Sequence, residues 1–134
     1  MPTSSSRQAA DNLAAAIAAG VEGATRAMPI IGERIVADIQ ASLSSPAAPS
    51  APGSPPARRT GELIASYRTE LGRDKRGRPY VEVSSDHEAA AMLEFGTSEM
   101  PARPHVRPAV AREAPQVGRT VAEAWAAAQR GRGK

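Results

Sequence analysis

Between residues 13 and 43 an apolar side chain recurs at every third or fourth position. These positions are Leu13, Ile17, Val21, Ala24, Met28, Ile31, Ile35, Ile39 and Leu43. Side chains at this spacing share one face of an α-helix, so residues 1–43 are predicted to form an N-terminal helical region. Pro29 cannot donate a backbone hydrogen bond, and a kink or break is therefore expected near residues 27–30.

The middle of the chain changes character twice. Residues 44–57 contain only Pro, Ala, Ser and Gly, which is typical of an extended loop. Apolar and polar side chains then alternate in residues 66–71 and 78–85, on either side of a charged turn, and this predicts an antiparallel hairpin. Residues 87–95 are expected to form one or two helical turns that lead into a final strand over residues 93–97.

The C-terminal part has helical spacing again. Residues 109–130 are predicted to form a helix with Pro115 near its start, and residues 131–134 a frayed basic tail. Between the loop and this helix, residues 58–108 are expected to be the β-rich core. The predicted fold class is α+β, in one domain over residues 1–134: a long N-terminal helix, a small antiparallel sheet and a C-terminal helix.

Composition limits how much core this chain can build. Only 3% of its 134 residues are aromatic, and alanine makes up much of the 41% that are hydrophobic. Alanine contributes far less burial energy than leucine or phenylalanine. The isolated protomer is therefore expected to be marginally stable, and association with identical copies is one way to bury more surface.

Several classes of protein are not supported. The absence of cysteine excludes a disulfide framework and thiolate metal sites, and it fits an intracellular origin. Glu22 and Arg26 interrupt the alanine-rich segment 13–31, so neither a signal peptide nor a membrane span is predicted. Asp86, His87 and Glu88 are consecutive and point in different directions, which disfavours a metal site. We expect no cofactor and no enzymatic activity.

Positive charge is moderate, at +3 with an isoelectric point near 9.9. The charged turn carries four basic residues that could contact DNA phosphates: Arg73, Lys75, Arg76 and Arg78. A solvated hairpin tip explains the same pattern, and no interleaved aromatic residues indicate base stacking. A basic nucleic-acid-binding module is kept as an alternative function.

The most unusual stretch is residues 94–108. Glu94 stands between two apolar residues, and a carboxylate that loses its water needs a cation or several N–H donors. On the expected strand it would face solvent, a turn or a partner. Gly96 permits a sharp turn and Thr97 can hydrogen-bond locally, while Pro101, Pro104 and Pro108 stiffen the exit. The stretch is either a stiff connection or a rigid loop presented to a neighbouring subunit.

These residues resemble a family of tailed-phage proteins: the tail-component, tail-completion or head–tail joining (neck) proteins of siphovirus-like particles. The resemblance rests on three ordered motifs, matched by Thr60, Gly61, Leu63 and Ser66, by Glu94, Phe95, Gly96 and Thr97, and by Pro104, Arg107, Pro108 and Ala109. His105 stands where the family often has phenylalanine, and the 44–57 loop is longer than usual.

The resemblance implies a structural virion protein without an active site, assembled in the host cytoplasm and placed in the neck or tail. Copies would form a six- or twelve-fold ring around the channel through which DNA passes without sequence-specific contact. The neighbours would be the head-side connector or stopper protein and the tail terminator or tail tube. The motif residues would build structure and interfaces. A tail terminator or minor tail protein is the alternative within the same setting.

Overall fold

The computed structural model describes residues 4–44 and 61–132. Apart from Ser44, the predicted loop over residues 44–57 lies outside the described residues. Thr60, the first residue of the upstream motif, and the last two residues of the predicted tail lie outside them as well.

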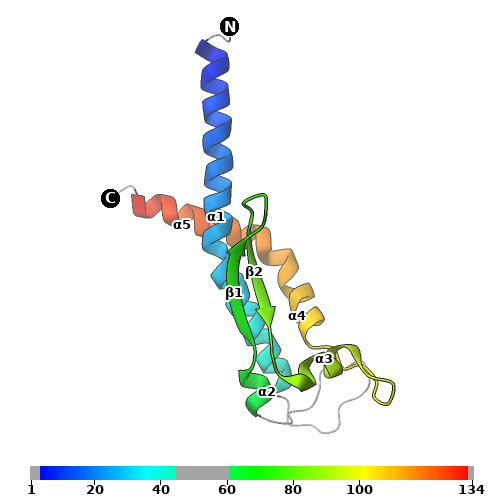
Figure 1. Ribbon diagram of the computed structural model, residues 1–134. Helices are drawn as coiled ribbons and strands as arrows, with labels where there is room; N and C mark the ends of the chain where they lie inside the picture. Colours follow the sequence, from blue (N-terminus) through cyan, green and yellow to red (C-terminus); the bar gives the residue numbers. More distant parts are fainter. Residues whose placement is uncertain (1–3, 45–60, 133–134) are drawn as a thin grey trace.

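Helix α1 (Ser4–Leu43) is one 40-residue helix with Pro29 inside it. The expected break near residues 27–30 is absent, although the helix changes direction in its middle (Figure 1). A proline removes a single backbone hydrogen bond, and packing against other elements on both sides of Pro29 keeps the neighbouring turns helical. Of the two expected outcomes, the structure has a change of direction and no break in the helix.

The remaining elements confirm the predicted α+β class, a long N-terminal helix with a two-stranded antiparallel sheet and a C-terminal helical region. In chain order they are α2 (Gly61–Ala65), β1 (Arg68–Arg73), β2 (Pro79–Ser84), α3 (Glu88–Phe95), α4 (Val106–Glu113), the 3-10 turn η1 (Ala114–Gln116) and α5 (Val117–Arg132).

The hairpin pairs Arg68 with Ser84 and Leu71 with Val81. It lies along α1, where the alternation predicted from the sequence turns Val81 and Val83 toward the core. Gly32 makes this contact close. A Cβ atom at that position would come within 2.7 Å of Val81 Cγ2, so the helix and the strands touch through a residue without a side chain.

The C-terminal helix differs from the prediction of one helix over residues 109–130. Helical structure begins earlier, at Val106, and η1 interrupts it around Pro115. Pro108 is the third residue of α4, where the N–H has no partner within the helix and its loss costs little. Pro115 falls farther along and shifts one turn to 3-10 geometry.

The core lies along the inner half of α1. The buried apolar side chains are Ala27, Ile31, Ile35, Ile39, Leu43, Leu63, Tyr67, Leu93 and Ala109. Helix α5 crosses α1 at Gly23, where an added Cβ would stand 2.8 Å from Trp125 Cβ. Arg112 of α4 binds Asp38 through two hydrogen bonds of 2.7 Å each. The hairpin, α4 and α5 therefore all pack on the same helix.

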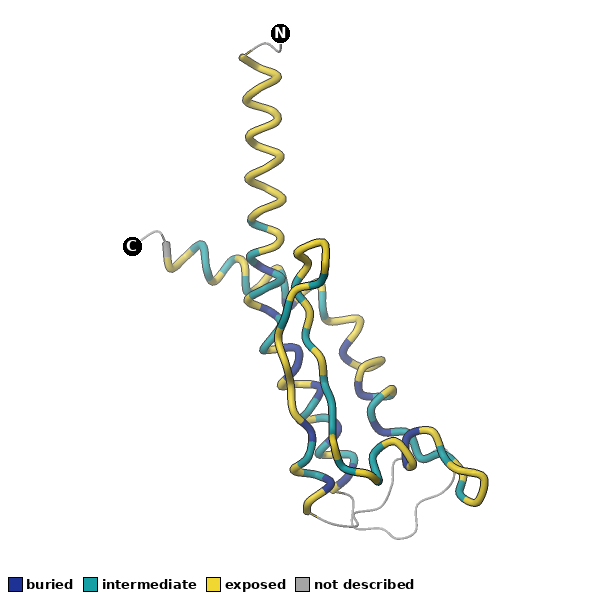
Figure 2. The backbone as a smooth tube through the Cα atoms, viewed as in Figure 1, coloured by how far each residue is buried: buried dark blue, intermediate teal, exposed yellow. Residues whose placement is uncertain are grey.

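The outer half of α1 has no such cover. Residues 4–18 are all exposed (Figure 2), including Leu13 and Ile17 with exposed fractions of 62% and 60%. At 1.5 Å per residue α1 is about 60 Å long, whereas the 16 residues of α5 extend about 24 Å. The shorter elements cannot reach the whole apolar stripe.

Candidate functional site

The 94–97 motif begins at the end of a helix, and the expected strand over residues 93–97 is wrong. Helix α3 runs from Glu88 to Phe95 and starts at His87, whose Nδ1 accepts a hydrogen bond from Ala89 N at 3.1 Å. Three alanines and this N-cap favour a helix over a short strand. His87 is thus a helix cap rather than one of three metal ligands.

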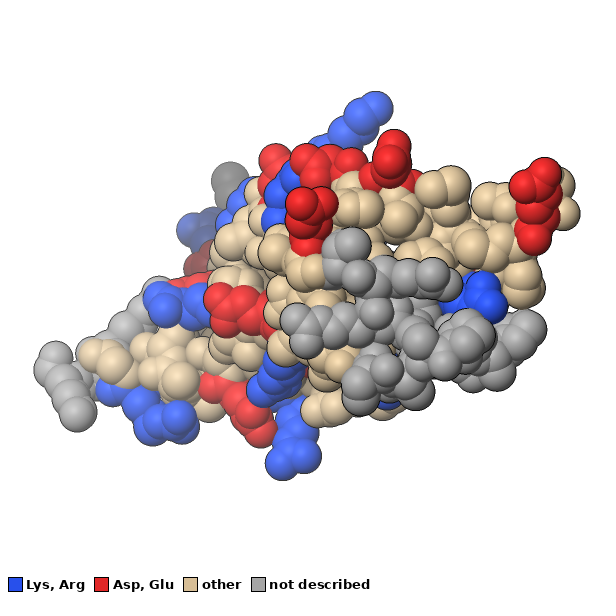
Figure 3. All heavy atoms as spheres, turned by 90° about the horizontal axis from the view of Figure 1, so that it is seen from below, with Lys and Arg blue, Asp and Glu red and all other residues tan. Residues whose placement is uncertain are grey.

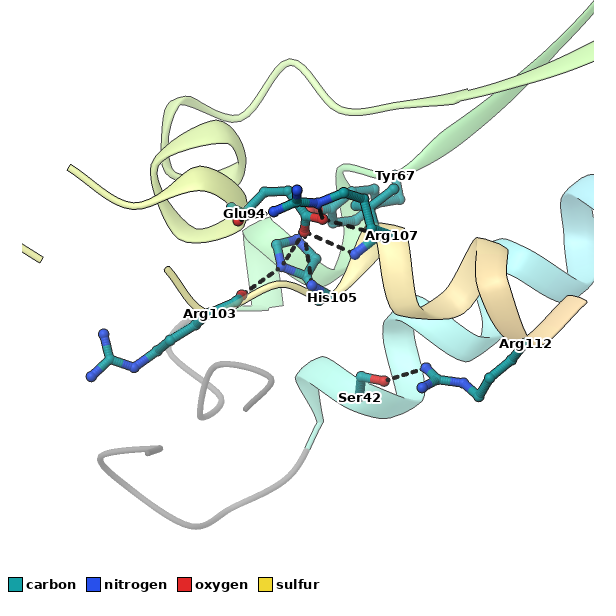
Figure 4. A network of polar contacts seen from close by, with 8 residues as sticks. Ser42, Tyr67, Glu94, Arg103, His105, Arg107 and Arg112 are labelled. Carbon is teal, nitrogen blue, oxygen red and sulfur yellow. Dashed lines mark hydrogen bonds and ion pairs between the residues drawn. The ribbon is translucent and has the colours of Figure 1, made fainter. Parts of the chain in front are cut away.

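Glu94 caps the start of α4. Its side chain is buried and accepts hydrogen bonds from the backbone N–H groups of His105, Val106 and Arg107 at 2.8, 2.9 and 2.9 Å (Figure 4). The first N–H groups of a helix have no internal partners and carry partial positive charge, which suits a carboxylate. The expectation that a desolvated Glu94 needs a cation or several N–H donors is confirmed, and these partners belong to its own chain. The alternative that Glu94 faces solvent is wrong, because its side chain is buried.

Arg107 links this buried carboxylate to the surface. Its Nε donates to Glu94 Oε1 at 3.1 Å, and its Nη2 donates to the backbone oxygen of Glu94 at 3.1 Å. The guanidinium carbon lies 5.1 Å from the centre of the Phe95 ring, a cation–π geometry. Phe95 itself is 68% exposed. The Arg107 guanidinium and the Phe95 ring therefore pack against each other at the surface, and hydrogen bonds to Glu94 hold Arg107 in position.

His105, at which the sequence departs from the resembled motif, is fully buried. Its Nδ1 lies 3.3 Å from the Arg103 carbonyl oxygen and 3.4 Å from Glu94 Oε2. Both are acceptors, so the ring proton resides on Nδ1, and Nε2 accepts a hydrogen bond from the Tyr67 hydroxyl. Burial and the Glu94 charge raise the pKa of Tyr67 to about 12, which keeps this hydroxyl protonated.

Gly96 and Thr97 shape the exit from α3. Gly96 has φ 76° and ψ 174°, and its N–H donates to Met92 O at 2.8 Å. Thr97 N donates to Met100 O at 2.8 Å, and Thr97 Oγ1 accepts from Glu99 N at 3.2 Å. The four motif residues therefore have separate structural functions. Glu94 caps α4, and Phe95 packs against Arg107 at the surface. Gly96 adopts the positive φ that ends α3, and Thr97 closes the turn that follows.

Acidification is expected to destabilise the fold in two steps. Burial lowers the pKa of His105 below its ordinary 6.5, against the opposing effects of Arg103 and Glu94. For Glu94, burial raises the pKa, but the N–H donors of His105, Val106 and Arg107 outweigh it and hold the pKa below 4.5. Because both values are lower in the folded state, the unfolded chain binds protons first, and stability falls below pH 6.5 and again below 4.5.

Free energies of unfolding measured from pH 8 to pH 3.5 would check this. His105→Phe should remove the upper step and keep the lower one. An unfolding free energy that stays constant from pH 7 to pH 5 in the unmodified protein would contradict the assignment of the upper step to His105.

A groove lies beside this network. It encloses about 200 Å³ between β2, α3 and the start of α4, and its lining is mainly apolar: Tyr67, Val83, Ala90, Ala91, Phe95 and Val106, with Ser84, Ser85, Glu94 and Arg107. Nothing in the sequence signalled this groove, because its walls come from segments up to 40 residues apart that only the fold brings together.

The other predicted motif residues lie in three different places. Leu63 is buried in the core, whereas Gly61 opens α2, and a Cβ atom added to it would meet nothing within 4 Å. Pro104 directly precedes the buried His105, and Pro108 lies in the first turn of α4. The second and third motifs thus form one network, and the first motif contributes Leu63 to the neighbouring core.

Two of the basic side chains in the turn between β1 and β2 make hydrogen bonds within that turn. Arg78 Nε donates to Asp74 Oδ2 at 2.7 Å, and the backbone N–H groups of Arg76 and Arg78 donate to Asp74 Oδ1 at 2.9 Å each. Arg73 donates to Gly77 O and to Thr25 Oγ1. Of the four candidate DNA contacts, Arg73 and Arg78 therefore stabilise the turn, and Lys75 and Arg76 project from it with exposed side chains.

Neither a metal centre nor a membrane span is found in the described part of the chain. In residues 4–44 and 61–132 no group of three or more His, Asp or Glu side chains is arranged to hold a metal ion. Within those same ranges no helix has the length and hydropathy needed to cross a membrane.

Comparisons of the chain with protein-family models, with curated proteins and with solved structures found no match. The resemblance to the tail-completion family stays a prediction that rests on the three motifs.

Proposed function

We propose that this protein is a structural component that works as a homo-oligomeric ring, and that the ring is the neck of a tailed-phage-like particle. The observation that carries the proposal is the uncovered outer half of α1. There Leu13, Ile17 and Val21 continue the helix face that the core buries farther along.

Exposed apolar side chains at helical spacing are costly on a solitary protein. Burying a leucine, isoleucine or valine stabilises by about 1.5–3 kcal/mol, and larger exposed apolar patches mark interaction sites. Small residues beside these side chains, among them Ala10, Ala14 and Gly20, let another helix approach closely. Self-association would cover this stripe in a protein with a small core.

The network around Glu94 supports the placement in the phage family. The two motifs that end at Thr97 and begin at Pro104 are the two sides of one buried cluster, in which Glu94 caps α4. Such a cluster fixes the loop between them without offering an activated nucleophile or base. In the proposed ring, the neighbours are the head-side connector or stopper and the tail terminator or tail tube, and DNA passes through the lumen.

Replacing Ile17 with glutamate is expected to dissociate the ring. The matched control is Ala15→Glu, which introduces the same charge about 200° around the helix from Ile17. Light scattering of the purified protein should give the mass of six or twelve copies for the unmodified chain and for Ala15→Glu, and of fewer copies for Ile17→Glu. In particles, only Ile17→Glu should lower the yield of tailed, DNA-delivering virions.

A monomeric mass for the unmodified chain at high concentration, together with its absence from particles, would refute the proposed function. A tail terminator or minor tail protein would give the same mass result and would differ in where labelled protein lies along the particle.

The nucleic-acid-binding alternative has weaker support, because Arg73 and Arg78 are engaged within the turn. Figure 3 views the molecule from the end opposite this turn, and there basic and acidic side chains are interspersed. A salt titration separates the two functions: phosphate contacts predict a steep loss of DNA affinity with salt, whereas a channel wall needs no measurable affinity.

A further inference from the structure

Among the apolar surfaces left uncovered in the described residues, two lie far apart on the protomer. The first is the arm stripe, made of Leu13, Ile17 and Val21 on the outer half of α1. The second is the α3 groove, the apolar groove lined by Val83, Ala90, Ala91, Phe95 and Val106. Figure 1 places them at opposite ends of the molecule, since α3 lies near the inner end of α1. One copy therefore cannot bring its own two surfaces together.

We infer that the arm stripe of one copy docks in the α3 groove of the next copy. This inference rests on the proposed self-association and names the two surfaces that form it. The contact joins two different surfaces, so it is heterologous, and repeated contacts of this kind generate a closed ring when the rotation between copies closes.

The dimensions of the two surfaces agree. The arm stripe extends from Leu13 to Val21, which is about 12 Å along the helix axis, and the eight residues of α3 have about the same length. The groove, with its volume of about 200 Å³, has room for branched apolar side chains. Ala90 and Ala91 on the groove side and alanines beside the stripe allow the two helices to approach closely.

The surface area buried by one contact between an arm stripe and an α3 groove favours a ring over an isolated pair of copies. The arm stripe from Leu13 to Val21 forms about 12 Å of helix, and laying half of a cylinder about 10 Å across against a partner covers on the order of 190 Å². With a matching area on the partner, one contact buries about 400 Å², which is well below the roughly 1,200 Å² of stable specific interfaces. In a ring each copy makes the contact twice, once through its arm and once through its groove.

Pairing of two arms with each other is the simplest rival. It would cover Leu13 and Ile17, but it would leave the groove open and Phe95 and Met92 exposed at the other end of each copy. Docking of arm into groove covers both surfaces with one contact.

Contacts within the protomer position part of the groove wall before any helix docks on it. The Arg107 guanidinium packs on the exposed Phe95 ring, and the buried Glu94 carboxylate accepts a hydrogen bond from Arg107. A wall fixed before binding loses little conformational entropy when a helix docks on it. This gives the Glu94 network a function in assembly that acts through the shape of the groove.

Cysteine cross-linking tests the contact directly, because the chain has no cysteine of its own. Ile17→Cys and Ala91→Cys are placed on separate copies that carry tags of different mass, co-expressed, and treated with a short bismaleimide. We expect a cross-linked heterodimer that contains one copy of each kind. Ala15→Cys, on the far side of the arm, replaces Ile17→Cys as the matched control and should give at least tenfold less product.

The outcomes separate this inference from the proposed function. An oligomeric mass with cross-links only between two Ile17→Cys copies would show arm-to-arm pairing and overturn the docking. An oligomeric mass without the heterodimer would overturn it as well. A monomeric mass for all variants and for the unmodified chain would overturn the proposed function itself.

Discussion

Glu94→Ala should lower the free energy of unfolding by about 3 kcal/mol. The substitution removes the acceptor for three backbone N–H groups at the start of α4, those of His105, Val106 and Arg107. A buried donor left without a partner costs about 1–3 kcal/mol, and water can reach only part of this cluster. Since domains of this size have total stabilities of about 5–15 kcal/mol, the loss would be a large fraction of the whole.

Two variants make the interpretation specific. Glu94→Gln keeps the volume but turns N–H donors toward other donors, so it should recover less than half of the lost stability. Glu99→Ala removes an exposed carboxylate from the same loop and should change stability by less than about 0.5 kcal/mol. Urea unfolding at pH 7 gives all three values. Equal losses for Glu94→Ala and Glu99→Ala would show that the cap contributes nothing.

Gly96→Ala is the second large effect, with an expected loss of about 3–4 kcal/mol. The backbone angles of Gly96 lie in a region that is nearly closed to other residues, which costs about 1–3 kcal/mol. In addition, the new Cβ would stand 2.8 Å from Ala102 N and 2.9 Å from Met100 O. Met100 O is the acceptor of the Thr97 N–H that closes the turn, and Ala102 N follows two residues later, so relief of the clash requires the backbone of this segment to move.

The chain offers controls for each part of this cost. Gly77 also has a positive φ, of 77°, but an added Cβ there meets nothing within 4 Å. Gly77→Ala therefore measures the cost of a positive φ without the clash. Gly118→Ala, in a helix with open space around it, should stabilise by up to about 1 kcal/mol. Thermal unfolding should rank the variants in the order 118, 77, 96, and a reversal of the last two would contradict the clash.

Regular patterns in the sequence were sufficient to predict the hairpin and the class of the fold. Alternation in the two strands and the Gly-containing turn between them are local signals, and β1 and β2 fall within two residues of the predicted ranges. The apolar stripe on α1 is also local. Which half of that stripe is covered is not a local property, because it depends on the lengths of α5 and the strands and on where they cross α1.

The errors have physical causes at particular residues. The strand expected over residues 93–97 came from alternation across only five positions, whereas Ala89, Ala90 and Ala91 and the His87 cap extend α3 through Phe95. The partners of Glu94 lie 11 to 13 positions later in the chain, and no spacing rule identifies such a contact. Tyr67, 38 residues before its partner His105, had no local signature at all.

Because α1 is much longer than the elements packed on it, its outer half extends beyond them and can tilt relative to the rest of the protein. Its inner half is tied to α4 through Asp38 and Arg112, and the crossing at Gly23 is the last point of support. From there to Ser4 the rod extends about 28 Å, so a tilt of about 6° displaces its tip by about 3 Å while the internal hydrogen bonds of the helix stay intact. In the proposed ring, subunits joined through such helices would match neighbours of different width with almost no deformation of their folded bodies.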